Sequence, residues 1–415
     1  MRMTTEPLPE TTRLLHIGLP KTGSTALQHA AMTQRLRLRE EGVVYPGKAE
    51  NHHRGLSWLA GLKVDYLKDP VPRAPWWRAL DRELGRFPGH RALLSFEMTC
   101  TTDAAGAAAT VDAVGAQGDR PVHVVLVMRN LGGFVPSYWQ ESLKRGKTRT
   151  LDEYLRRALA DPAAVASSGA FHRRDGMGLI ERWAGVVGPE NLSVIVLEKE
   201  HPTRLLDTFE NLLALPAGIL HEAEPRGVEA NRGMTPAEAA LVLKLNRMIL
   251  AKWKAPEDEH RALVFKGAVN RLLANREPTA AEGRLMIPHW AADACAEAGF
   301  LLAESVREAG VRVVGDLAEL ERTAKYTEED VSVPPEQIPF DVALESLLGM
   351  YAGATGWDAS HKKMIRRGPT AEELTEQLAG AKEEIARLTA ELRELRATKS
   401  RGGRYRALLR AGLRR

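Results

Sequence analysis

The stretch Leu14-Leu15-His16-Ile17-Gly18-Leu19-Pro20-Lys21-Thr22-Gly23-Ser24-Thr25 lies close to the N-terminus. It begins with a short apolar run, passes through a turn bounded by two glycines, and continues over residues 25–37 with helix-forming composition. Glycines let a backbone approach an anion closely, and the N–H groups at the start of a helix point toward it. The stretch therefore predicts a strand, a phosphate-binding turn and a helix.

Apolar runs of strand length recur in the first half of the chain. They cover residues 92–96, 122–128 and 192–197, and longer stretches with helix-forming composition separate them. Helices are predicted over residues 151–159, 179–187 and 204–213. This alternation is typical of a parallel sheet with crossover helices. We therefore predict an α/β fold of three layers with a central parallel sheet.

Composition divides the chain into four parts. The main domain is expected over residues 13–325, with a mainly helical portion from 235 to 325. That portion opens with Thr235-Pro236-Ala237-Glu238, which combines a capping box with proline at the first helical position. Residues 326–369 begin with an acidic, proline-containing run and are predicted to be a linker and irregular segment. A coiled coil is expected over 370–398, and a basic amphipathic tail over 399–415.

The coiled coil is predicted from spacings that alternate between four and three residues. The apolar positions are Leu374, Leu378, Ala381, Ile385, Leu388, Leu392 and Leu395. A repeat of about three heptads favours a homo-oligomer, while a helix folded back on its own domain remains the alternative. In the tail, leucines share one helical face with arginines opposite, a pattern that favours contact with an anionic membrane surface; a solvated tail is the alternative.

Charge, cysteine content and the N-terminus restrict the class of protein. The net charge is +4, but residues 399–415 hold seven basic and no acidic residues, so the rest of the chain carries −3. The main domain has no basic stretch with interleaved aromatics, and nucleic acid is not an expected partner. Cys100 and Cys295 are read as buried thiols. Residues 1–13 lack a signal-peptide pattern, so we expect a cytoplasmic protein, in which the tail would allow peripheral contact with the inner membrane surface.

The turn at residues 18–25 departs from the Walker A pattern. In that pattern a lysine follows the second glycine, but here Ser24 holds that place and the lysine is Lys21. The order Pro-Lys-Thr-Gly-Ser-Thr instead resembles the phosphosulfate-binding loop of sulfotransferases that use 3′-phosphoadenosine 5′-phosphosulfate (PAPS). A second stretch agrees, because Val124 to Asn130 delivers Arg129 from an apolar strand and Ser137 follows eight positions later, as in the 3′-phosphate motif of that family.

The resemblance covers residues 13–250 and implies a P-loop-like fold with PAPS as the donor and no required metal. It implies that Lys21, Thr22, Gly23, Ser24 and Thr25 bind the phosphosulfate, with Lys21 also catalytic, and that Arg129 and Ser137 bind the 3′-phosphate. The late nucleotide-binding element of cytosolic members is absent from the chain. Arg226, Asn231 and Arg232 are the candidates for that contact, since they precede the predicted helix at Thr235.

The general base is left open among three side chains. His52 and His53 lie in a polar loop, and histidine titrates near neutral pH. Glu97 follows the strand at 92–96, where the carboxyl end of a parallel sheet faces a site. Members of different branches of the family use histidine or glutamate, so the resemblance does not choose between them.

The expected acceptor is a glycan or glycolipid precursor, because the layout resembles bacterial members of the family. Two other functions compete. A P-loop nucleotide kinase would need Mg²⁺ and ATP, against which the displaced lysine argues. An inactive sulfotransferase-like scaffold would act through the coiled coil, against which intact Lys21, Arg129 and Ser137 argue.

Overall fold

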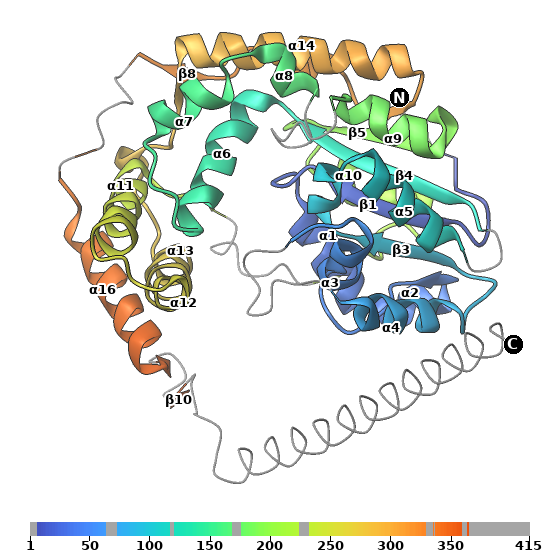
Figure 1. The fold of residues 1–415 in the computed structure, drawn as a ribbon, viewed down its shortest axis with the longest axis horizontal. Coiled ribbons are helices and arrows are strands. Elements are labelled where there is room, and N and C mark those ends of the chain that lie inside the picture. Colours follow the sequence, from blue (N-terminus) through green and yellow to red (C-terminus); the bar gives the residue numbers. More distant parts are fainter. Residues whose placement is uncertain are drawn as a thin grey trace, which may run out of the picture. The chain divides into compact units, whose positions relative to one another are not determined.

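The computed structural model describes residues 6–63, 73–116, 120–167, 176–223, 232–328, 335, 337–358 and 363–364. The chain forms two compact units, residues 1–350 and 351–415. The first unit contains the sheet and the helical portion that follows it (Figure 1).

The first unit is built on a six-stranded sheet in which every strand is parallel to its neighbours. In spatial order the strands are β2 (Val43–Val44), β3 (Arg91–Ser95), β1 (Arg13–Gly18), β4 (Val122–Arg129), β5 (Leu192–Leu197) and β7 (Arg312–Val314). This confirms the predicted α/β fold with a central parallel sheet. β2 and β7 were not predicted, because two or three residues are too few to show a strand period.

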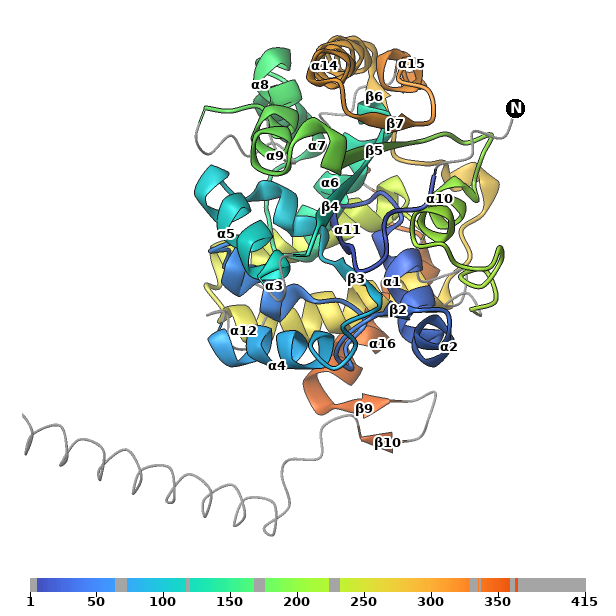
Figure 2. The same cartoon turned by 90° about the vertical axis from the view of Figure 1, so that its right-hand side faces the viewer.

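Helices pack on both faces of the sheet because its strands are apolar on both faces. On β1, Leu14 is buried in a cluster with Leu27 and Phe209, while its neighbour Leu15 is buried with Leu56 and the helices of the opposite face. Figure 2 shows α1 (Ser24–Thr33), α2 (Arg35–Glu40) and α10 (Arg204–Leu212) on one side of the strands, and α3 (His53–Leu59), α5 (Ala104–Gly115) and α9 (Leu179–Val187) on the other. Helix α4 (Ala74–Leu84) packs on α3.

The remaining elements of the first unit are mostly helical, as predicted. They are α6 (Leu131–Lys144), α7 (Leu151–Ala158), α8 (Pro162–Ser167), α11 (Pro236–Asn246), α12 (Glu257–His260), α13 (Asn270–Asn275), α14 (His289–Ala309) and α15 (Ala318–Glu321), with π-helical segments Arg247–Lys252 and Arg261–Val269. Short 3₁₀ segments cover Glu97–Thr101, Pro189–Asn191 and Ala280–Glu282. The capping box of α11 is confirmed, because Thr235 Oγ1 accepts from the Glu238 N–H and Glu238 accepts from the Thr235 N–H.

The segment predicted as an irregular linker contains regular structure. β8 (Tyr326–Thr327) pairs with β6 (Ile287–Pro288), and α16 (Phe340–Thr355) is a helix of 16 residues. It escaped prediction because its outward face is apolar, so the sequence shows no amphipathic pattern. In the second unit, β9 (Trp357–Asp358) and β10 (Lys363–Met364) form an antiparallel pair. The predicted coiled coil at 370–398 and the tail at 399–415 lie outside the described residues.

Two further expectations concern cysteines and membranes. Cys100 and Cys295 are free and buried, as expected, and burial raises the pKa of the Cys295 thiol to about 12. None of the helices within the described ranges is long and apolar enough to cross a membrane.

Candidate anion-binding site

The loop between β1 and α1 takes a conformation that few residues other than glycine allow. Gly18, Lys21 and Gly23 have φ angles of 95°, 63° and 84°. A Cβ on Gly18 would lie 2.7 Å from the carbonyl oxygen of Glu97, so no side chain fits there. Gly23 stands at the N-cap of α1 and offers no side-chain acceptor, which leaves the first N–H groups of the helix open to an anion.

Lys21 is held in this loop from two directions. A guanidinium nitrogen of Arg129, at the end of β4, donates to the Lys21 carbonyl at 3.1 Å. The Lys21 Nζ donates to Glu141 Oε1 of α6 at 3.2 Å, and Lys144 donates to the same oxygen at 2.7 Å. Burial lowers the pKa of Lys21, partly offset by the Glu141 charge. Burial also opposes ionisation of Glu141, but the charges of Lys144 and Lys21 outweigh it and hold the pKa of Glu141 at about 2.

Arg129 and Ser137 lie on consecutive elements, β4 and α6. Gly133 makes room for the guanidinium, since a Cβ there would lie 2.7 Å from its terminal nitrogen. Burial lowers the pKa of Arg129. Asn130 caps α6 by accepting from the Gly132 N–H at 3.0 Å, and its amide donates to the carbonyl of Glu319 at 2.9 Å. Neighbouring elements therefore place the start of α6 firmly next to the loop.

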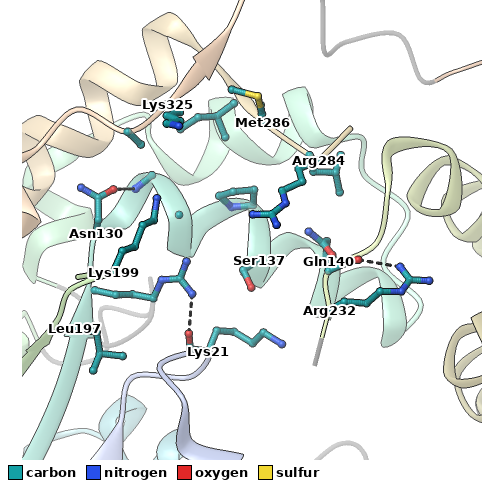
Figure 3. Close-up of a pocket in the computed structure, with 18 of the residues that line it drawn as sticks. Lys21, Asn130, Ser137, Gln140, Leu197, Lys199, Arg232, Arg284, Met286 and Lys325 are labelled. Carbon is teal, nitrogen blue, oxygen red and sulfur yellow. Dashed lines mark hydrogen bonds between the residues drawn. The ribbon is translucent and has the colours of Figure 1, made fainter. Parts of the chain in front are cut away.

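These residues line a cavity of about 1400 Å³ (Figure 3). Its wall includes the loop residues Lys21, Thr22 and Gly23, together with Arg129 and Ser137. In Figure 3, Ser137 lies between Lys21 and Arg284. The charged lining residues are cationic Lys21, Arg129, Lys199, Arg232, Arg284, Arg322 and Lys325 and anionic Glu198, Glu200 and Glu319. The cavity therefore favours an anionic ligand.

The position of the cavity follows from the order of the strands. β1 lies between β3 and β4, so the chain winds toward β3 and β2 on one side and toward β5 and β7 on the other. Ligands of open parallel sheets bind where the winding direction changes, outside the carboxyl ends of the strands. Here that place lies between the ends of β1 and β4, which carry the Lys21 loop and Arg129.

Two residues of the predicted phosphosulfate loop do not line the cavity. Ser24 is buried, and its hydroxyl has no hydrogen-bond partner among the described residues. Thr25 is exposed in the first turn of α1. Thr22 is buried and its hydroxyl donates to the carbonyl of Leu19, which fixes the turn. The cavity therefore meets the loop through Lys21, Thr22 and Gly23.

The candidate bases gather around the carboxyl end of β3, and none of the three lines the cavity. His52 is 3% exposed, and both ring nitrogens are engaged: Nδ1 accepts from the Ser95 N–H at 3.0 Å and Nε2 donates to the Pro46 carbonyl at 2.9 Å. Burial lowers its pKa to about 4. Both ring nitrogens of His52 are therefore occupied by hydrogen bonds within the fold, which argues against His52 as the base.

His53 and Glu97 remain as candidates. His53 begins α3, and its Nδ1 lies 2.5 Å from Asn51 Oδ1. Burial, and secondly the Arg54 charge, lower the pKa of His53 to about 4. Glu97 accepts a hydrogen bond from Gln28 of α1 at 3.0 Å, and its backbone packs against Gly18. Glu97 is therefore in direct backbone contact with the first residue of the loop.

Arg232 lines the cavity but has no donor left for a ligand. Its five N–H groups point to the carbonyls of Arg276, Gly233 and Leu272 and to both carboxylate oxygens of Glu238. Glu238 is fully buried, and this pair fixes the start of α11. The guanidinium of Arg232 therefore supports the wall, and a contact between Arg232 and the nucleotide stays a prediction. Arg226 and Asn231 lie outside the described residues.

Among the cavity residues that sequence reasoning missed are Lys199, Arg284 and Lys325. They come from the segment after β5, from the segment between Glu282 and β6, and from the residue before β8. No ion pair or hydrogen bond joins their side chains to any part of the chain that the structure describes. Nothing in their sequence surroundings marks them, because isolated basic residues in loops are common.

A group with metal-ligand chemistry lies away from this cavity. Asp207, Glu210 and His221 have ligand atoms within 4.8 Å of one another. Both oxygens of Glu210 already accept from backbone N–H groups, those of Gly218 and Leu220, and His221 is bonded to Asp207 at 2.8 Å. These hydrogen bonds attach the loop after α10 to that helix, and they explain why the three side chains lie together.

Comparisons with known proteins add no relative. No protein family model, no curated protein and no solved structure matches the chain.

Proposed function

We propose that the protein is a PAPS-dependent sulfotransferase with a P-loop-like fold. The observation that carries the proposal is that Lys21, Arg129 and Ser137, which come from three elements, line one cationic cavity where the winding of the sheet changes direction. These are the residues that the sequence motifs single out.

The donor would be held at its two charged ends. The N–H groups at the start of α1 and Lys21 would bind the 5′-phosphosulfate. The Arg129 fork and the Ser137 hydroxyl would bind the 3′-phosphate, the group that distinguishes PAPS from ATP. Binding of the 5′ end would draw the Lys21 ammonium away from Glu141, which keeps Lys144 as a partner.

The reaction would be an in-line displacement. An acceptor oxygen forms a bond to sulfur while the bond between sulfur and the bridging oxygen breaks, and the electron pair stays on the phosphate of the departing PAP. Lys21 would stabilise that developing charge. The acceptor proton goes to a base, for which Glu97 and His53 remain.

The cavity leaves room for an acceptor beside the donor. Its volume of about 1400 Å³ exceeds the roughly 300–1,000 Å³ of pockets that hold one small ligand. Lys199, Arg284 and Lys325 supply hydrogen-bond donors in the part of the wall that the donor motifs do not include. A hydroxylated acceptor such as a glycan or glycolipid precursor stays our proposal, and so does cytoplasmic function.

The test is a calorimetric titration of the full chain with PAP, beside ATP with Mg²⁺. Replacing Arg129 with alanine should weaken PAP binding about 10- to 100-fold, because it removes charge-assisted bonds to a phosphate. Arg91→Ala is the matched control, since Arg91 is also half-buried at a strand end and also donates to a backbone carbonyl, that of Leu8. It begins β3, however, and so lies at the amino ends of the strands, whereas Arg129 lies at the carboxyl end of β4. Equal PAP affinity in wild type and Arg129→Ala would refute the 3′-phosphate role, and binding of ATP alone would refute the sulfotransferase.

A further inference from the structure

Helix α16 presents a row of large apolar side chains to solvent. They are Phe340, Leu344, Leu347, Leu348 and Tyr351, with exposed fractions of 81%, 40%, 65%, 41% and 61%. Their spacing of four, three, one and three residues places them on one face of a helix. They make up five of the twelve large apolar side chains that are exposed in the described part of the chain. Such a concentration marks an interaction surface.

The opposite face of α16 is attached to the helical portion of the first unit, which fixes the direction of the apolar row. Asp341 pairs with Arg276 at 2.5 Å, and Glu345 pairs with Arg271 at 2.7 Å. Gly349 packs so closely that a Cβ would lie 2.5 Å from the Gly267 carbonyl oxygen. Rotation of the helix to bury its apolar row would break both ion pairs and this contact. The row therefore stays exposed unless another surface covers it.

The exposed row carries no charge. The only charged residues of α16 are Asp341 and Glu345, and both are paired with arginines on the attached face. Two identical rows can therefore meet without like-charge repulsion. A basic or acidic partner would find no complementary charge, so the chemistry of this face suits a partner whose surface is equally apolar.

We propose that the face formed by Phe340, Leu344, Leu347, Leu348 and Tyr351 is the interface between two copies of this chain. Two-fold pairing brings the same row of each copy together, the usual arrangement in homodimers. The proposal does not depend on the enzymatic activity proposed above.

The chain that follows α16 favours a second copy over closure within one chain. The heptad positions from Leu374 to Leu395, for which the sequence predicts a helix, cover 22 residues and would extend over about 33 Å, whereas the exposed row spans 12 residues, about 18 Å. Folding the repeat back on α16 would leave nearly half of its apolar positions uncovered. If α16 pairs with α16 of the second copy, and the heptad segment pairs with the same segment of that copy, the paired surfaces have equal lengths.

The experiment is sedimentation velocity on the full chain over a range of concentrations. Wild type should be a dimer. Leu347→Glu should weaken dimerisation at least about 100-fold. In a two-fold dimer each copy loses a buried leucine and gains a buried carboxylate, so both unfavourable contributions to the free energy of association occur twice. Leu36→Glu is the matched control, since Leu36 is likewise an exposed helical leucine, at 70%, and should leave the dimer unchanged.

A third variant, Leu388→Glu, separates the arrangements. If both elements pair between copies, Leu388→Glu and Leu347→Glu each weaken the dimer. A monomeric wild type overturns the proposal, and self-association appearing in Leu388→Glu would then show that the heptad segment covers α16 in the same chain. A dimer that Leu347→Glu leaves as tight as wild type also overturns it. Unchanged thermal unfolding monitored by circular dichroism in all three variants shows that the fold is intact.

Discussion

Replacing Glu141 with glutamine should strengthen donor binding at neutral pH. In the free protein the Glu141 carboxylate holds the Lys21 ammonium at 3.2 Å, and the same oxygen also accepts from Lys144. A phosphosulfate must compete with this carboxylate for Lys21. The neutral amide keeps the size of the side chain but removes its charge, so the competition falls.

The size of the effect follows from exposure. The Lys21 and Glu141 side chains are 34% and 23% exposed, so solvent screens their attraction and the pair is worth no more than about 1 kcal/mol. Lost competition of that size strengthens PAP binding by about 2- to 5-fold. At high pH the variant should instead lose PAP binding earlier than wild type does. Glu141 partly offsets the burial that lowers the pKa of Lys21, so the variant lowers this pKa further. PAP binding uses the charged ammonium of Lys21, so it is strongest below the pKa of free Lys21 and weakens as the pH rises through this pKa. In the variant this decline should therefore occur at a lower pH.

Calorimetry of PAP binding between pH 6 and 10 measures both effects, with Glu304→Gln as the control because Glu304 pairs with Arg307 on α14 and does not line the cavity. PAP affinity lower than wild type at pH 7 would refute the reasoning, since it would mean that Glu141 keeps Lys21 in its binding position instead of competing for it. An unchanged pH profile would refute the electrostatic coupling of Lys21 and Glu141.

The remaining predictions concern the wall, the loop and the base. Arg276→Met should lower the unfolding midpoint by about 2–4 °C in calorimetry, because it removes charge-assisted hydrogen bonds to the buried Glu238, which keeps Arg232 as a partner, at a cost of about 1.5–3 kcal/mol in a unit of 350 residues; an unchanged midpoint would contradict a stabilising role of this pair. Gly18→Ala should destabilise by more than about 1 kcal/mol in urea unfolding, since its φ is 95° and its Cβ would lie 2.7 Å from the Glu97 carbonyl oxygen, and wild-type stability would contradict the close approach. Sulfate transfer from PAPS should fall about 100-fold or more in either Glu97→Gln or His53→Ala while PAP affinity stays within about twofold, and normal turnover in both would exclude them as the base.

Local patterns in the sequence predicted much of the fold. The four predicted strands were found because buried parallel strands are continuous apolar runs, and the α11 start because a capping box involves residues three positions apart. β2 and β7 escaped because two or three residues are too few to show a strand period, and α16 escaped because its outer face is apolar. For the site, Lys21, Arg129 and Ser137 were identified from motifs and do line one cavity.

The sequence by itself determined the loop, because a glycine-bounded turn between a strand and a helix depends on residues within a few positions of one another. Only the tertiary structure decided which charged side chains are available. Arg232 is used up by Glu238 and three carbonyls, and His52 by Ser95 and Pro46, while Arg284 faces the cavity without a partner in the described ranges. The physical reason is that a hydrogen bond satisfies a polar group wherever its partner lies in the chain, so pairing depends on contacts that no local pattern records.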